Sequence, residues 1–139
     1  MLVISFFLMY GVMFLNIMEV SHFYISITRI YMAILMVSLM AVSMILLMGD
    51  MYPNKKANNG IVITGVVVFA LTLAALRTQT PVGDVQYMKA MIPHHSSAIL
   101  TSSHANLKDP EVKKLSEGII AAQEKEIAEM KAMIERLDK

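Results

Sequence analysis

Three long apolar runs fill the first half of the chain and constrain its fold more than any other feature. They cover residues 1–18, 30–48 and 61–76. A helix needs about 20 residues to cross the hydrocarbon core of a bilayer, with about 17 as the lower limit. The first run lacks the basic start and the small-residue cleavage site of a secretion signal, so we expect it to be retained. We therefore predict an all-α membrane protein with three transmembrane helices, over about 1–20, 30–50 and 60–77.

Charge is divided unevenly along the chain. Residues 1–77 hold four Lys/Arg and two Asp/Glu, whereas residues 78–139 hold eight and nine. The first part is suited to lipid and the second to water. We therefore predict a transmembrane domain over 1–78 and a water-exposed domain over 84–139.

Several function classes are excluded by composition. The net charge of +1 provides no basic field for nucleic acid. The lack of cysteine excludes disulfides and thiolate chemistry. The sequence contains no Ser/His/Asp arrangement, phosphate loop or dinucleotide fingerprint. We therefore expect no catalytic residues and no enzyme activity.

The short loops predict the orientation of the membrane part. The loop over 50–60 carries Lys55 and Lys56, whereas the loop over 19–29 carries one acid and one base. Short loops rich in Lys and Arg stay in the cytoplasm. With three crossings, the N-terminus is then cytoplasmic and the charged domain lies on the extracytoplasmic side.

The charged part reads as two helices joined by a tight turn. Asp84 is a good helix cap, which predicts a helix over about 84–106 with a bend or restart at Pro93. Asp109 caps the second helix and is followed by a proline at its first position, which predicts a helix over about 110–137. Two antiparallel helices cannot bury an apolar stripe alone. We therefore expect the hairpin to complete a helical bundle by self-association, as a homo-oligomer.

Polar side chains interrupt the apolar stripe of the second helix. They are Gln123 and Glu126, and an unpaired buried carboxylate is costly, so Glu126 should have a partner. Folding the two helices about a turn at 108–109 places Met91 level with Glu126, and places His94 and His95 level with Gln123 and Ala122. The spacing alone therefore brings together a set of candidate metal ligands: Met88, Met91, His94, His95, Gln123, Glu126 and Met130.

The side-chain types in this cluster favour a soft metal. Thioethers select Cu(I), imidazole suits copper broadly, and Ag(I) should behave like Cu(I). Zinc sites more often use Cys, His and carboxylate without Met. Two other interpretations stay open. Met in a helical stripe is commonly core filling, and a buried His or Glu can simply hydrogen-bond across a bundle and fix its register.

The membrane part carries methionines in a regular pattern. Residues 32, 36, 40, 44 and 48 are all Met, so that a thioether recurs every four residues along the second apolar run. These side chains either pack against helices and lipid or form a path for Cu(I) or Ag(I). Polar groups near the outer end of the first run suggest a second candidate metal site. Its residues are Met18, Glu19, His22 and Met32.

Three separated motifs carry a family resemblance. They are MIPHHSSAI over 91–99, DPEVKKL over 109–115 and IIAAQEKEIAEM over 119–130. In this order they resemble the bacterial ferritin-like domain of unknown function that is often found beside copper- and silver-resistance genes. The segment 22–52 is similar to the membrane-anchored branch of that family.

The resemblance has consequences for the site, the location and the partners. It implies an extracytoplasmic helical domain on the bacterial inner membrane that binds copper through Met and His, at the seven positions already named. It also implies partners among metal-efflux or copper-handling proteins. Family members often carry two such hairpins, whereas this chain has one, which favours self-association.

These features together predict a membrane-anchored extracytoplasmic copper- or silver-binding protein for metal handling or resistance, with Cu(I) favoured. One alternative is an oligomeric channel or transport component with a methionine-lined path. Another is a structural membrane subunit without metal. A carboxylate-bridged di-iron oxidase is disfavoured, because that site needs several inward Glu and Glu-x-x-His pairs, which this chain lacks.

Overall fold

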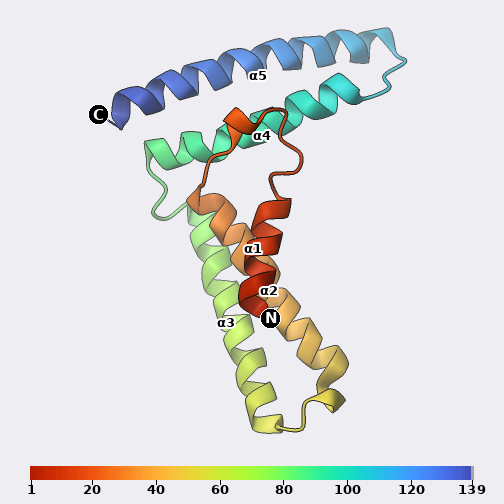
Figure 1. Ribbon diagram of the computed structural model, residues 1–139, viewed down its shortest axis with the longest axis vertical. Helices are drawn as coiled ribbons and strands as arrows, with labels where there is room; N and C mark the ends of the chain where they lie inside the picture. The colour runs from red at the N-terminus through yellow and green to blue at the C-terminus, as the bar shows by residue number, and fades with distance from the viewer. Residues whose placement is uncertain (139) are drawn as a thin grey trace. The chain divides into compact units, whose positions relative to one another are not determined.

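Helices are the only regular elements in the computed structural model, which describes residues 1–138 (Figure 1). The all-α prediction is therefore confirmed for these residues. The α-helices are α1 (Leu2–Val12), α2 (Ile27–Met48), α3 (Lys55–Thr78), α4 (Asp84–His104) and α5 (Pro110–Leu137), with short 3-10 helices η1 (Val20–His22) and η2 (Gly49–Met51). The chain divides into two compact units. Unit 1 holds 1–13 and 27–82, and unit 2 holds 14–26 and 83 onward.

Two helices of unit 1 are long and apolar enough to cross a membrane. α2 has 22 residues with a mean hydropathy of 2.5, and α3 has 24 residues with a mean hydropathy of 2.2. At 1.5 Å per residue, each exceeds the roughly 30 Å of a hydrocarbon core. α3 begins earlier than predicted because the Asn54 side chain accepts the Ala57 N–H at 3.1 Å and so caps the helix.

The prediction of a third transmembrane helix over 1–20 is wrong. α1 has only 11 residues, which gives about 16 Å, far less than a crossing. After it the chain turns, and the Asn16 side-chain amide donates to Ser97 Oγ at 2.7 Å. At the end of α1 the Arg29 guanidinium donates to the Met13 carbonyl. A hydropathy pattern carries no information on hydrogen bonds to distant residues. Such bonds satisfy the polar groups of residues that lie outside a helix.

The segment 14–26 belongs to unit 2. The predicted transmembrane domain over 1–78 takes this segment in, whereas the structure groups it with the helical hairpin. The link is made by polar contacts, because the Met18 N–H donates to Ser96 Oγ at 2.7 Å and Lys131 Nζ donates to Ser21 Oγ at 3.2 Å. Unit 2 is therefore more than the two-helix hairpin predicted over 84–139.

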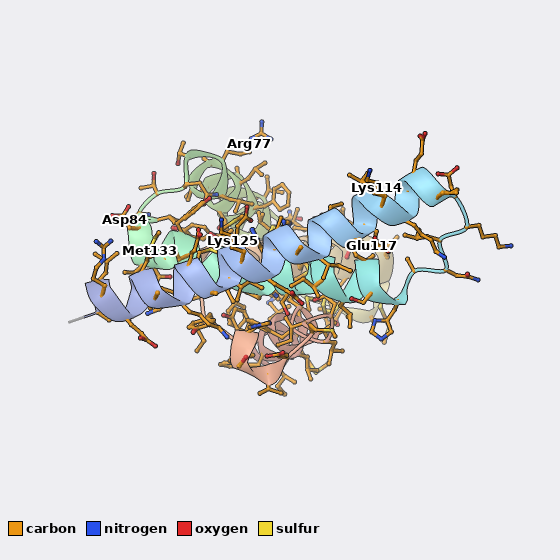
Figure 2. The ribbon with its side chains drawn as sticks, turned by 90° about the horizontal axis from the view of Figure 1, so that it is seen from above. Arg77, Asp84, Lys114, Glu117, Lys125 and Met133 are labelled. Atoms are coloured by element: carbon orange, nitrogen blue, oxygen red, sulfur yellow. The ribbon has the colours of Figure 1, made fainter. Side chains whose placement is uncertain are left out.

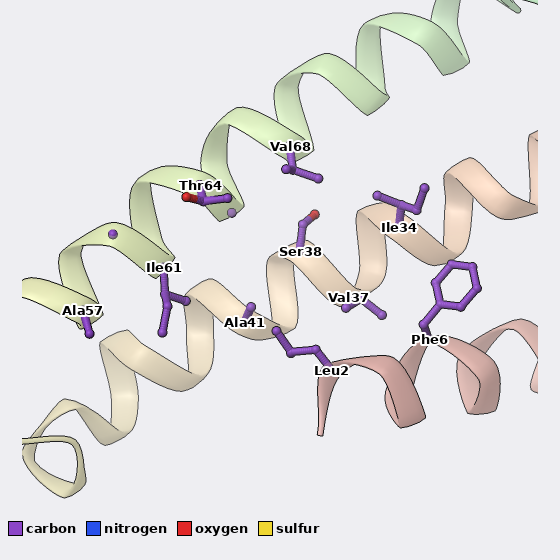
Figure 3. A pocket seen from close by; sticks show the side chains of 12 residues that line it. Leu2, Phe6, Ile34, Val37, Ser38, Ala41, Ala57, Ile61, Thr64 and Val68 are labelled. Carbon is purple, nitrogen blue, oxygen red and sulfur yellow. The ribbon is translucent and has the colours of Figure 1, made fainter. Parts of the chain in front are cut away.

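Small residues let α2 and α3 approach closely inside unit 1. Gly65 is buried, and a Cβ added there would lie 2.6 Å from Val42 Cγ2. Beside this contact, α1, α2 and α3 surround an apolar cavity of about 460 Å³ (Figure 3). Phe6 reaches it from α1, Ser38 from α2 and Thr64 from α3 (Figure 3).

In unit 2, α4 and α5 run antiparallel, side by side (Figure 1). The predicted cap at Asp109 is confirmed, because its carboxylate accepts the N–H groups of Glu111 at 2.9 Å and Val112 at 3.0 Å. α4 continues without a break through Pro93 and ends at His104. The apolar core of the unit is formed by Met88, Ile92, Ile99, Ile127 and Ile134.

Charged side chains cover the side of α5 that is turned away from α4. Figure 2 looks onto that side, with Lys114 and Lys125 along the helix. Lys125 Nζ lies 3.8 Å from Glu129 Oε1, one turn further along. Such exposed pairs contribute little to stability.

Candidate functional site

A buried histidine on α4 contacts a carboxylate on α5. His95 is 8% exposed, and its Nε2 lies 2.6 Å from Glu126 Oε2. The prediction that Glu126 has a partner is confirmed. The pairing is offset from the predicted one, in which Met91 lies level with Glu126, by about one helical turn. α4 ends at His104 rather than at 106, and residues 105–109 connect it to α5.

Two polar atoms beside this pair are buried and have no hydrogen-bond partner within the described part of the chain. They are His95 Nδ1 and Gln123 Oε1. A buried polar atom without a partner costs about 1–3 kcal/mol. Native proteins rarely leave such atoms unmet, and an ion is one of the groups that can satisfy them.

The other predicted ligands have different environments. Met88 is buried at 6% exposure, and Met130 packs against the same apolar cluster. Met91 is half-buried. His94 is exposed, with its ring 6.1 Å from that of His95. The structure therefore joins His95 to Glu126 directly, places two thioethers in the adjoining core, and turns His94 to the surface.

Among the described residues, His95 and Glu126 are not part of a larger cluster of acidic and histidine side chains. Across residues 1–138, no group of three or more His, Asp or Glu side chains could hold a metal ion. Any metal bound near His95 therefore has to take ligands of other types, such as the thioethers and the amide oxygen named above.

A second buried histidine lies in the segment 14–26. His22 is 7% exposed, and its Nδ1 lies 2.9 Å from Ser96 Oγ. Its Nε2 lies 3.8 Å from Glu19 Oε2. The pKa of His22 is below the ordinary value of 6.5, chiefly because burial penalises the charged ring and secondly because the Lys131 ammonium repels it, against a smaller opposite effect of Glu19. His22 is therefore held neutral.

A cavity of about 260 Å³ adjoins His22 within unit 2. Met18 and Glu19 from the segment 14–26 line it, together with Ser103 of α4 and Glu124 of α5. Three of the four residues of the predicted second site therefore meet at one cavity. The fourth, Met32, lies on α2 in unit 1.

Sequence reasoning missed the residues that hold this cavity together. Ser96 is fully buried and bonds both His22 and the Met18 backbone. Glu124 is exposed on α5 and reads as a solvated charge. The only sequence signal for Ser96 is its place beside His95 on the inner face of α4. Its partners lie more than 70 residues away, so spacing along one helix does not reveal them.

The comparisons with known proteins cover α4 and α5 and extend beyond them. Residues 66–138 match the family described as "Domain of unknown function (DUF305)". One relative is "Uncharacterized protein L153" of Acanthamoeba polyphaga mimivirus, 38% identical over 107 residues that cover 76% of this chain and 68% of that protein. No solved structure matches the chain. The family match covers more than half of the chain, including all of the helices that position His95 and Glu126, and the chain therefore belongs to the DUF305 family.

Proposed function

We propose that this protein is a membrane-anchored, extracytoplasmic binder of Cu(I) or Ag(I) that serves metal handling or resistance. The proposal rests on the environment of the two ring nitrogens of His95. One ring nitrogen is held by the Glu126 carboxylate at 2.6 Å, and the other is buried and unpartnered.

A histidine with one ring nitrogen bonded to a carboxylate and the other free is the usual arrangement of a metal-binding histidine. A metal-binding histidine usually donates its second ring N–H to a carboxylate, which fixes the ring and makes the ligating nitrogen more basic. Glu126 does this to Nε2, so His95 Nδ1 is left with a lone pair for an ion. The carboxylate itself is half exposed and acts on the ion through the ring.

Thioethers on the face of α4 that carries His95 and in the adjoining core favour a soft ion. Met91 lies four residues before His95 on α4 and Met88 seven residues before it, so they share a helical face with the imidazole. Met130 comes from α5 and packs on the same core. Thioether and imidazole donors favour Cu(I) and Ag(I) over hard cations. The unpartnered Gln123 Oε1 is available as a weak oxygen donor.

The proposed membrane anchor consists of α2 and α3, which would each cross the bilayer once. Lys55 and Lys56 stand at the start of α3 and favour the cytoplasm. The opposite ends, Ile27 of α2 and Thr78 of α3, then lie outside. Unit 2 is attached through residues 26 and 83, next to those outer ends. The proposed side therefore remains extracytoplasmic with two crossings in place of three.

Ag(I) titration of the full chain in detergent, in competition with a chromophoric chelator, tests the proposal. We expect His95→Ala to weaken Ag(I) binding at least tenfold and Met91→Ala to weaken it less. Loss of a carboxylate that orients a ligating histidine costs about 10–100-fold, which is the range expected for Glu126→Gln. The matched control is His104→Ala, because His104 is exposed on the same helix and its Nδ1 lies 3.0 Å from the Leu100 carbonyl oxygen of that helix.

The rival structural role of the His95–Glu126 pair gives a different result. A pair that only fixes the register of α4 and α5 would lower the unfolding temperature when His95 is replaced and leave Ag(I) affinity unchanged. A second readout is the shift in unfolding temperature with Ag(I), because an ion that binds only the folded state stabilises it by mass action. Wild-type protein that shows neither binding nor a shift contradicts the proposal.

A further inference from the structure

We propose that the segment 14–26 is an interfacial anchor, which buries its apolar side chains in the bilayer surface between the headgroups and the acyl chains. The inference rests on the membrane anchor proposed above for α2 and α3. Val20 is 88% exposed and Leu15 is 80% exposed, and Phe23 and Ile25 are exposed as well. Apolar side chains gathered on a short exposed segment are typical of a surface that contacts a membrane or a partner.

The connections of the segment favour lipid as that partner. It follows Met13 at the end of α1 and leads directly into Ile27, the first residue of the membrane-spanning helix α2. Val20 lies seven residues before Ile27, and seven extended residues reach at most about 25 Å. The exposed apolar side chains are therefore kept close to the level at which α2 leaves the bilayer.

The backbone of the segment is prepared for an apolar environment. The N–H groups of Ile17, His22 and Phe23 donate to carbonyls three residues earlier, at 3.3, 3.0 and 3.0 Å. The Met18 N–H is bonded by a serine of α4, and the rings of Phe14 and Phe23 pack with their centroids 4.2 Å apart. Backbone groups with partners cost less to move away from water. The segment can therefore enter the bilayer surface in its folded form.

The charge of the segment sets a shallow depth. Glu19 is its one Asp, Glu, Lys or Arg side chain, and its carboxylate accepts the Ser21 hydroxyl at 3.0 Å. Ser21 Oγ in turn accepts from Lys131 Nζ of α5 at 3.2 Å. A carboxylate is costly in hydrocarbon, so Glu19 stays at the headgroup level. Helices that lie in this boundary bury their apolar face by about 5–10 Å, and we expect the same depth for Val20.

The anchor also bears on the hairpin that carries His95. The Asn16 amide donates to Ser97 Oγ at 2.7 Å, and the Met18 N–H donates to Ser96 Oγ at 2.7 Å. These two serines directly follow His95 along α4. A segment held in the bilayer surface therefore keeps this part of α4 near the membrane.

Tryptophan fluorescence measures the insertion, because the chain has no tryptophan of its own. The full chain is reconstituted into phosphatidylcholine vesicles, with or without phosphatidylcholine brominated on its acyl chains, which quenches tryptophan on contact. We expect Val20→Trp and Leu15→Trp to be quenched at least twofold more strongly than Ala128→Trp, which reports from an exposed face of α5. Bromines near the carboxyl end of the acyl chain should quench them more than bromines near the methyl end.

A charge at Val20 tests the insertion from a second position. In the Leu15→Trp protein, Val20→Glu should reduce quenching by lipid at least twofold, because it places a carboxylate among acyl chains. Ala128→Glu adds the same charge on α5 and should leave the quenching unchanged. Equal quenching in the two double variants would contradict the anchor.

A tryptophan on α2 separates failure of this inference from failure of the membrane anchor. Leu39 is exposed near the middle of α2, so Leu39→Trp should be quenched most by bromines near the methyl end. If it is, while Val20→Trp and Leu15→Trp are quenched no more than Ala128→Trp, the interfacial anchor is wrong and the membrane-spanning pair stands. If Leu39→Trp is not quenched, both are wrong. A blue-shifted Val20→Trp without quenching by lipid means that protein covers the segment, which also overturns the inference.

Discussion

The two buried histidines of unit 2 differ in what holds them. The His95 ring is tied to a carboxylate, whereas the His22 ring is tied to a neutral hydroxyl and faces the Lys131 ammonium. Burial and Lys131 both oppose a proton on His22, so its pKa is lowered from 6.5. At the residue scale, His22 is therefore a group whose protonation opposes the folded state.

This shift has a direct consequence for stability. In the unfolded chain His22 takes up a proton near pH 6.5, before the folded protein does. The contribution of His22 to the free energy of unfolding is then fully present above about pH 6.5. It is lost as the pH falls from there through the lowered pKa of the folded state. We expect the unfolding temperature in detergent to fall between pH 7 and 5, and His22→Gln to flatten that slope. His104→Gln is the control, and parallel curves for wild type and His22→Gln would contradict the assignment.

At the scale of elements, the contact between α2 and α3 depends on one glycine. A Cβ at Gly65 would press on Val42, which is β-branched and has little freedom to turn away. Gly60, on the same helix, has open space within 4 Å. The two glycines therefore form a matched pair for testing whether the helices pack as described.

We expect Gly65→Ala to lower the free energy of unfolding of the detergent-solubilised protein by about 1–3 kcal/mol, the usual cost of overpacking. Gly60→Ala should be neutral or stabilising by up to about 1 kcal/mol, because alanine favours the helix. Unfolding by titration with a denaturing detergent measures both. Val42→Ala should restore Gly65→Ala, and equal effects of the two glycine changes would rule out the close contact.

Patterns within a short stretch of sequence predicted the helices whose limits are set by neighbouring residues. The apolar runs located α2 and α3, and the Asp109 cap with its following proline located the start of α5. The stripe argument predicted a partner for Glu126 but missed the register of the two helices by about one turn. The length of α1 and the role of Ser96 depend on contacts between distant parts of the sequence. No periodicity within one helix carries that information.

At the scale of the whole molecule, unit 2 exposes an apolar stripe along α5. Leu115 is 64% exposed and Leu137 is 47% exposed, and further apolar residues lie between them on the same helical face. Glu111 and Arg136 are exposed near opposite ends of the helix and, 25 positions apart, fall within about 20° of each other around it. An antiparallel second copy would place each beside its opposite charge, so we propose a homodimer of this face.

Light scattering of the detergent-solubilised protein, corrected for bound detergent, measures this association. We expect wild type to be dimeric or larger and Leu115→Lys to weaken the association at least tenfold, because a charge replaces an apolar contact. Ala128→Lys introduces the same charge on the opposite, exposed face of α5 and should leave association intact. A monomeric wild type, or equal effects of the two variants, would contradict the dimer.

The division of unit 2 into two stretches also determines the order in which it can form. The segment 14–26 is synthesised well before α4, and its Met18–Ser96 contact joins residues 78 positions apart. Closing a loop of that length carries an entropic cost that only the finished contacts repay. During synthesis the segment 14–26 therefore lacks its partners until α4 and α5 have been synthesised. A ribosome that stalls after α3 leaves His22 exposed to water and to any ion there, so its neutral, buried state is a property of the completed chain alone.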